Sequence, residues 1–256
     1  MNGKKDTVGE LYKKVAQYDK VLKLFVFLNV VSALAESLTN FSFNEVLLVV
    51  EIISAVAVVI IRWLINYNFY YTAEKARIEY AMSDGYNVDL TLKKTEGYYT
   101  NSVSPSLKRY AMNILESNYY TMKESEKMIA PHIIKNVIII ALILIAMIKT
   151  SNISFILAGV QGIFTASIIE NSISLIIYHN EMVKLYDSQY ETFLKTDAAT
   201  TDSQVYEAIC IRNIVEYEVV KAYFKVQLDQ KIYEKYRGEI ANEWNEIEKT
   251  LNHKNV

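Results

Sequence analysis

The sequence predicts an all-α integral membrane protein with four transmembrane helices in two hairpins and a helical cytosolic domain. Three observations support this fold class: four apolar stretches, an uneven distribution of Lys and Arg, and only 2 Pro and 7 Gly in 256 residues. Few Pro and Gly favour long uninterrupted helices. Since 22% of the residues are charged, we expect roughly half of the chain to lie in water.

The apolar stretches form two close pairs. They are Val21–Leu38, Val46–Ile65, Ile133–Ile148 and Ile153–Tyr178, and the links within the pairs are Thr39–Glu45 and Lys149–Asn152. A helix needs roughly 20 residues to cross the hydrocarbon core of a bilayer. The second and fourth stretches reach that length, and the other two need their flanks. Two membrane hairpins therefore explain the pattern better than a buried soluble core.

The positions of Lys and Arg predict the orientation. Six lie in the N-terminal arm up to Lys23, eight in residues 66–132 and ten after Tyr178, whereas the two links hold only Lys149. Four spans place all three charged segments on one side, and the positive-inside bias makes that side the cytoplasm. No signal peptide is expected, because the first 20 residues are polar. We expect both termini to be cytoplasmic.

These spans divide the chain into five segments. We expect a cytosolic N-terminal helix over 1–23, hairpins over 24–66 and 133–178, a cytosolic helix-loop-helix over 67–132 and a cytosolic helical region over 179–256. Ser83–Pro105 is expected to be a loop, since Asp84-Gly85 is typical of a turn and Ser104-Pro105 of a helix start. Pro131 either starts a new helix or kinks a continuous one.

The C-terminal region begins with a small-residue linker, Thr196–Asp202. Apolar residues then recur at helical spacing from Ser203 to about Arg237, Arg237-Gly238 predicts a stop, and a last helix is expected over Glu239–Leu251. The region after Tyr178 holds ten basic and fourteen acidic residues. Such an acidic helical tail is typical of a solvated or oligomer-forming face, and a dedicated partner site is the alternative.

Polar residues within the spans are candidates for lining a pore. A charged side chain in lipid costs about 2.5–3.5 kcal/mol, so such groups face protein or water. Two of the spans carry them at i, i+3 and i+7, which is one helix face. The candidates are Asn29, Ser32, Glu36, Glu51, Ser167, Glu170 and Ser174.

Two interpretations of these residues stay open. In the first, the first and fourth spans line a water-filled path whose acidic groups favour cations. In the second, the polar groups bond between helices and the carboxyls are protonated by desolvation. The second is at least as well supported for Glu36 and Glu51, and the first is favoured for Glu170. A stripe of small residues on the fourth span predicts close helix packing; it consists of Ala158, Gly162 and Ala166.

The segment between the hairpins combines bases with tyrosines. Bases beside aromatic faces bind nucleotides by stacking and charge. Two plainer interpretations are an aromatic belt at the membrane interface and tyrosines buried between helices. The candidate ligand-binding residues are Lys93, Lys94, Tyr98, Tyr99, Lys108 and Arg109.

Catalytic motifs are absent from the sequence. The three histidines have no metal-ligand spacing, and there is no glycine-rich phosphate loop, GxSxG elbow or HExxH motif. We therefore expect no enzyme, no metal and no cofactor. The net charge of −2 gives no reason to expect nucleic acid, and the single cysteine, Cys210, forms no intramolecular disulfide.

A family resemblance adds to this interpretation. The segment between the hairpins contains "AEKARIEYAMSDGYNVDLTLKKTEGYYTN" and "LKRYAMNILESNYYTMKESEKM", the latter with Asn113, Glu116 and Asn118. With the four-span layout, it resembles the four-transmembrane pore-forming effectors of bacterial anti-phage defence that are associated with SMODS nucleotidyltransferases and their SLATT relatives. The resemblance implies a membrane protein that a nucleotide second messenger or a cytosolic sensor protein triggers to permeabilise the inner membrane.

The expected function is therefore a gated membrane-disrupting effector in contact with membrane lipids. We expect a homo-oligomer, because four spans with few polar residues cannot enclose a wide pore alone. One alternative is a non-conducting scaffold whose helical tail recruits a cytosolic partner. The other is a small transporter or membrane-enzyme subunit, ranked last because the sequence predicts no broken helix.

Overall fold

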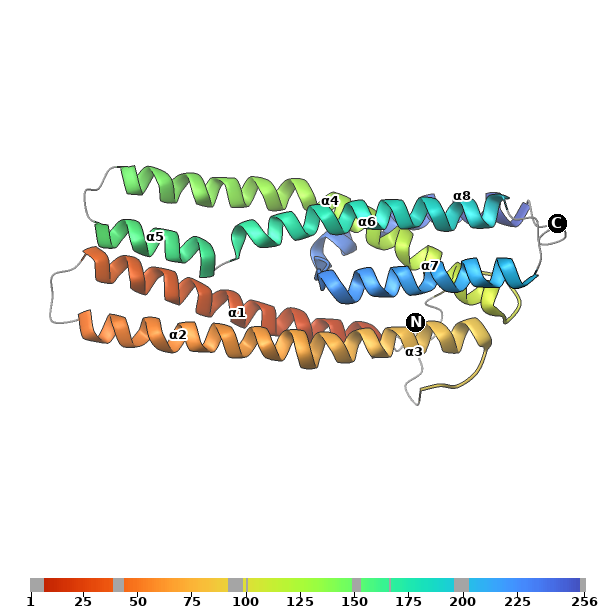
Figure 1. Cartoon of the computed structure of the whole chain (residues 1–256), viewed down its shortest axis with the longest axis horizontal. Coiled ribbons are helices and arrows are strands. Elements are labelled where there is room, and N and C mark those ends of the chain that lie inside the picture. The colour runs from red at the N-terminus through yellow and green to blue at the C-terminus, as the bar shows by residue number, and fades with distance from the viewer. Residues whose placement is uncertain are drawn as a thin grey trace. The chain divides into compact units, whose positions relative to one another are not determined.

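The computed structural model is built of helices, and it describes residues 7–38, 44–91, 99, 101–148, 153–165, 167–195 and 203–253 (Figure 1). No strand occurs in these ranges, which confirms the predicted all-α class. The elements are α1 (Thr7–Leu38), α2 (Asn44–Leu64), the π-helical turn η1 (Ile65–Phe69), α3 (Tyr70–Tyr86), α4 (Leu107–Ile148), α5 (Ile153–Thr165), α6 (Ile168–Lys195), α7 (Ser203–Phe224) and α8 (Gln230–His253).

Two helical stretches among the described residues are long and apolar enough to cross a membrane. The first is Glu45–Tyr86, in which α2 continues through η1 into α3, and the second is Leu107–Ile145 within α4. Pro131 lies inside α4, so the segment before it and the third apolar stretch form one helix.

The fourth apolar stretch is not one helix, and the prediction of a continuous span over Ile153–Tyr178 is wrong. Helix α5 ends at Thr165, α6 begins at Ile168, and Ser167 adopts a left-handed backbone with φ of 49°. The expectation that the chain has no broken helix is therefore also wrong. Polar side chains from α4 and α6 form hydrogen bonds at the start of α6, as the next subsection describes.

The turn predicted at Asp84-Gly85 is also wrong, because α3 runs on to Tyr86 and ends at Asn87, whose φ is 52°. Gly85 serves close packing instead: a Cβ atom there would lie only 2.6 Å from Cβ of Tyr110. Helix α4 then starts after Ser106, not at Ser104-Pro105. The Ser106 hydroxyl accepts a hydrogen bond from the backbone N–H of Arg109 (3.3 Å), as an N-cap does.

The predicted helix stop at Arg237-Gly238 lies inside α8. The break comes earlier, at Lys225, which has a φ of 49° and follows the end of α7. Asp229 begins α8, since its carboxylate accepts hydrogen bonds from the backbone N–H groups of Lys231 (2.8 Å) and Ile232 (3.4 Å). Gly238 is tolerated because nothing lies within 4 Å of the position its Cβ would take.

The chain divides into two compact units. One, the head unit, comprises Met1–Gly9, Ala73–Ile129 and Ser174–Val256, and the other, the span unit, comprises Glu10–Thr72 and Ala130–Ile173. Helices α3, α4 and α6 each contribute residues to both units.

Within the span unit, α1, α2 and α5 are joined by close contacts. Asn29 on α1 donates from Nδ2 to the backbone carbonyl of Glu51 on α2 (3.0 Å). Ala158 and Gly162 on α5 are buried, and a Cβ atom at Gly162 would lie 3.1 Å from Cγ1 of Val30. Two members of the small-residue stripe are thus packing positions. The third, Ala166, lies outside the described residues.

The head unit is built on a buried group of four charged side chains, here called the charged quartet: Glu74 and Arg77 on α3, and Glu218 and Lys221 on α7. Arg77 Nε donates to Glu74 (2.8 Å) and its Nη2 donates to Glu218, while Lys221 Nζ lies 3.2 Å from Glu74 Oε1. None of the four side chains is more than 19% exposed. Both cations also lie over the ring of Tyr217. Two carboxylates and two cations make the quartet neutral, which is what burial of charge requires.

We expect Arg77→Met to destabilise the head unit by about 3–5 kcal/mol, because it leaves the two carboxylates of the quartet with a single buried cation. The measurement is urea unfolding of the full chain in detergent micelles, followed by tryptophan fluorescence. The chain carries Trp63→Phe, so that the fluorescence of buried Trp244 alone reports unfolding. The control is Arg212→Ala on α7, an exposed i,i+4 partner of Glu216, which we expect to cost under about 1 kcal/mol. Equally small losses of unfolding free energy in both variants would show that the quartet contributes no more to stability than a surface ion pair.

Candidate functional site

The predicted pore-lining residues of the first hairpin are mostly engaged in helix packing. Asn29 and Ser32 are buried, at 1% and 5% exposure. The carbonyl that Asn29 bonds, that of Glu51, also accepts from the hydroxyl of Ser54 (2.9 Å). The Glu51 carboxylate accepts from Nε2 of Gln161 on α5 (2.6 Å). These contacts favour the interhelical interpretation for Asn29 and Glu51; Glu36 is half-buried.

The break in the fourth apolar stretch gathers a second set of polar groups. Ser167 occupies the break itself, and its carbonyl accepts from the backbone N–H of Asn171 (2.9 Å). The carbonyl of Ile168 accepts from the Ser172 hydroxyl (2.9 Å) and from Nδ2 of Asn136 on α4 (3.4 Å). Asn136 is buried and also donates to the Ser172 hydroxyl (2.8 Å). Side-chain donors from α4 and α6 thus meet at one backbone carbonyl in the first turn of α6.

Glu170 lies beside this break in the first turn of α6, and both Glu170 and Asn171 are exposed. A carboxylate is favoured at a helix N-terminus, where backbone N–H groups point. Ser174, one turn further along, is half-buried and belongs to the head unit. Ser167 and Glu170 are therefore brought together at the break. Asn136, Asn171 and Ser172 were not predicted, although Asn136 is the one amide in the third apolar stretch.

The predicted ligand-binding residues that the structure describes hold the fold together. Tyr99 is buried, stacks on Tyr80 with 6.0 Å between ring centroids, and shares a hydrogen bond with Ser117 (3.1 Å). Arg109 donates to both carboxylate oxygens of Asp84, at 3.1 and 3.2 Å. These contacts favour the plainer interpretation, a tyrosine buried between helices. Lys108 is half-buried. Lys93, Lys94 and Tyr98 lie outside the described residues.

The polar residues of the resemblance belong to the buried face of α4. Asn113 is fully buried, and its Nδ2 donates to the Asp84 carboxylate (2.8 Å) while its Oδ1 accepts from Asn101. Glu116 and Asn118 are buried as well, at 6% and 0% exposure. This face of α4 therefore contributes to the core of the head unit.

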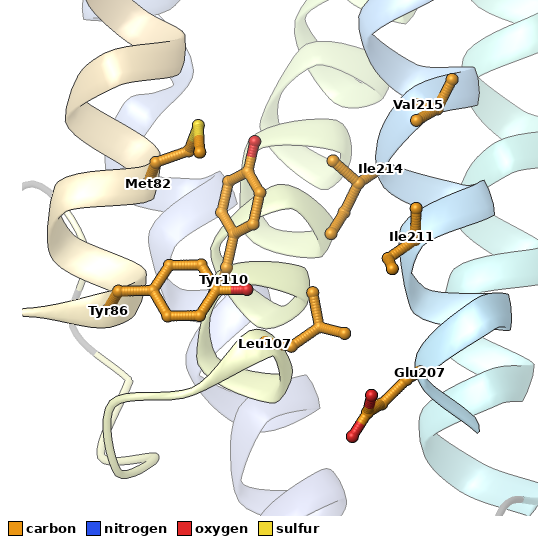
Figure 2. A pocket seen from close by; sticks show the side chains of 8 residues that line it. All are labelled: Met82, Tyr86, Leu107, Tyr110, Glu207, Ile211, Ile214 and Val215. Atoms are coloured by element: carbon orange, nitrogen blue, oxygen red, sulfur yellow. The ribbon is translucent and has the colours of Figure 1, made fainter. Parts of the chain in front are cut away.

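An open pocket of about 390 Å³ lies in the head unit between α3, α4 and α7 (Figure 2). Two tyrosine rings and four aliphatic side chains make it largely apolar, and Glu207 supplies a carboxylate at one end. It was not predicted, because its walls come from three helices far apart in sequence. Its lining residues are Met82, Tyr86, Leu107, Tyr110, Glu207, Ile211, Ile214 and Val215.

Another buried carboxyl, outside the charged quartet, lies on α4 in the head unit. Glu124 is 5% exposed, and burial raises its pKa to about 8, against the opposing charge of Lys221 on α7 and with a further increase from Asp229 before α8. Because the charged quartet is already neutral, Glu124 is mostly protonated near neutral pH. No sequence signal distinguishes it from the exposed carboxylates of the same helix.

The described residues offer little for catalysis. No group of three or more His, Cys, Asp or Glu side chains in these ranges is placed to hold a metal ion. Cys210 is buried, and burial raises the pKa of its thiol, which disfavours a nucleophilic thiolate. The arrangement is suited to packing and to changes of charge state, as at Glu124.

We expect the stability of the head unit to fall as pH rises from about 5 to 8. In the folded chain Glu124 holds its proton up to about pH 8, whereas in the unfolded chain it loses the proton near pH 4.5. The contribution of this proton to the free energy of unfolding is therefore complete below pH 4.5 and is lost as pH rises through 8. Glu124→Gln should flatten that dependence, by at most about 1.4 kcal/mol per pH unit.

The measurement is again the urea midpoint in micelles, from pH 5 to 9. The control is Glu246→Gln on α8, whose side chain is 74% exposed and which should leave the pH dependence as in the parent. An unchanged slope in Glu124→Gln would contradict a protonated Glu124.

In comparisons with known proteins, the chain matches no protein-family model, no curated protein and no solved structure.

Proposed function

We propose that this chain is an inner-membrane protein with four spans, and that it acts as a gated pore-forming effector in bacterial anti-phage defence. The observation that carries the membrane part is the exposure of its most apolar helical segments. In the most apolar 18 residues of Glu45–Tyr86 and of Leu107–Ile145, only 17% and 6% of the residues, respectively, are buried. A core helix of a water-soluble protein would be mostly buried.

Individual side chains of the span unit support the same inference. Large hydrophobic residues of the span unit are exposed on α1, α2, α4 and α5. Water-soluble monomers rarely expose contiguous apolar surface on this scale. A bilayer is the solvent that suits such a surface. Examples are Phe27 at 63%, Val59 at 68%, Leu142 at 62% and Leu157 at 62% exposure.

The polar break supports a water path. Glu170 and Asn171 are exposed although they lie within an apolar stretch, and a carboxylate facing lipid is costly. A water-filled path, lined by α6 of several copies, removes that cost. Irregular backbone at membrane depth is likewise tolerated where it lines a cavity or is buried in protein. We infer that Ser167 and Glu170 line the path and that Asn29 and Glu51 serve packing.

Gating is supported by the helices that belong to both units. A backbone irregularity lies inside or directly before each of α3, α4 and α6, close to the residue where the helix passes from one unit to the other. These are η1 (Ile65–Phe69), Pro131 and the break at Ser167. Such points are where helices bend. A cytosolic trigger at the head unit would act on the spans through them. The role in defence rests on the family resemblance.

A second candidate, a small transporter, is favoured by the same break. Transporter sites use discontinuous helices whose ends and freed backbone groups bind substrate. The buried Asn136 beside the break is the side chain that would take part. A transporter predicts saturable uptake by resting cells, whereas the effector predicts loss of the ion gradient only after a trigger.

We expect a fluorescent protein fused after Val256 to fluoresce, because both termini are proposed to be cytoplasmic. Alkaline phosphatase inserted within Thr39–Glu45 should be active, because that link is proposed to face the periplasm. Insertion of the phosphatase within Thr196–Asp202 is the control and should be inactive. Active enzyme at both sites would contradict the four-span topology.

We expect cells that express the chain to depolarise and admit propidium after phage challenge. Glu170→Gln should reduce the cation preference of the leak, because it removes the proposed lining charge. Glu181→Gln, which lies on the same helix in the head unit and pairs with Lys184, is the control and should behave as the parent. If membrane potential stayed intact throughout with the protein in the membrane, the effector proposal would fail.

A further inference from the structure

Helix α7 carries one row of exposed side chains, here called the ridge, that begins at the pocket and winds away from the buried face of the helix. Its inner face is buried through Cys210, Ile214, Tyr217 and Lys221. The ridge follows the four-residue spacing of a helix surface row. Its apolar members are Ile211, Val215, Val219 and Tyr223, which are 51%, 52%, 58% and 78% exposed. Exposed Glu207 is the first member of the same row.

The two ends of this ridge differ in shape. At the N-terminal end, Glu207, Ile211 and Val215 form one wall of the apolar pocket (Figure 2). At the C-terminal end, Tyr223 is the most exposed large hydrophobic residue of α7. Glu207 and Tyr223 are each eight residues from Val215. The ridge therefore carries a hollow on one side of Val215 and a protruding aromatic ring at the same spacing on the other.

We propose that two copies of this chain associate through α7, antiparallel, about a two-fold axis at Val215. A two-fold interface is self-complementary, so that residue i contacts j and j contacts i. Rows of this spacing pack into the grooves of a second helix at a crossing of roughly 50°, the commonest class in globular proteins. Tyr223 of each copy then covers the other's pocket, and its hydroxyl donates to Glu207.

The charges beside the ridge favour a second copy over an unrelated partner. Arg212 and Glu216 form an i,i+4 ion pair with 3.8 Å between Nε and Oε1, and both side chains are about half exposed. Reversal of the helix about Val215 brings Arg212 of one copy near Glu216 of the other. A ridge with a hollow and a protruding ring at equal distances from one residue, and with an opposite-charge pair beside that residue, complements its own reverse. This inference concerns α7 alone, and it holds whether or not the spans form a pore.

Cysteine cross-linking in native membranes tests the axis. The full chain carries Cys210→Ala to remove the single native thiol, and then Val215→Cys or Val205→Cys. These two valines lie on α7 and are 52% and 50% exposed. With mild oxidant we expect a disulfide-linked dimer for Val215→Cys, because the axis brings its two copies together, and little for Val205→Cys. Equal cross-linking of both would indicate random collision, and absence of a Val215→Cys dimer would also overturn the proposal.

A second substitution tests the aromatic contact. In the Val215→Cys chain, we expect Tyr223→Ala to slow dimer formation about tenfold, since truncation of a buried aromatic anchor typically costs more than one factor of ten in affinity. The matched control is Val205→Ala in the same chain, which should leave the rate unchanged. If Tyr223→Ala cross-linked at the parent rate, the pocket would have another occupant and the proposed register would be wrong.

Discussion

Charge neutrality in the buried interior of the head unit is the constraint on which its other features depend. The quartet joins α3 to α7 through two carboxylates and two cations, with Tyr217 beneath both cations. Because Glu218 and Lys221 must face inward, helix geometry determines which side of α7 faces outward. Val219 and Tyr223, which lie on the opposite side of α7, are therefore exposed as a consequence of where the charges are buried. Glu124 obeys the same constraint, since a further carboxylate beside a neutral quartet retains its proton.

Helix content and the apolar segments follow from the sequence, because periodicity and scarce Gly and Pro are local signals. Helix ends were predicted less well. Gly238 suggested a stop, but Ile240 and Trp244, both buried, hold α8 in place and outweigh the propensity cost of one glycine, about 1 kcal/mol. The true start of α8 had a local signal in Asp229, a good N-cap residue. The break at Ser167 had none, since neither Gly nor Pro marks it.

The contact partners of the candidate residues could not be predicted, for a different reason. Residue types were recognisable, but their partners come from distant segments. Glu74 with Arg77, and Glu218 with Lys221, each form an i,i+3 pattern that is typical of a solvated helix surface. Only the fold shows that the two pairs meet and are buried. Conversely, Arg109 and Tyr99 have the chemistry of a ligand site, and their contacts with Asp84 and Tyr80 serve packing.

The π-helical turn at Ile65–Phe69 has a consequence for the evolution of this chain. A single π turn amounts to one residue inserted into an α-helix, so the residues on either side of η1 are out of phase by about 100° of helical rotation relative to an uninterrupted helix. Loss of one residue from Ile65–Phe69 would restore regular hydrogen bonding and shift every later face of α3, including Glu74 and Arg77. A homologue that retains the quartet must therefore keep this extra residue or compensate for it by a second change of length before α3. An alignment that places a lone gap within η1 would mark a chain whose quartet is lost or rebuilt.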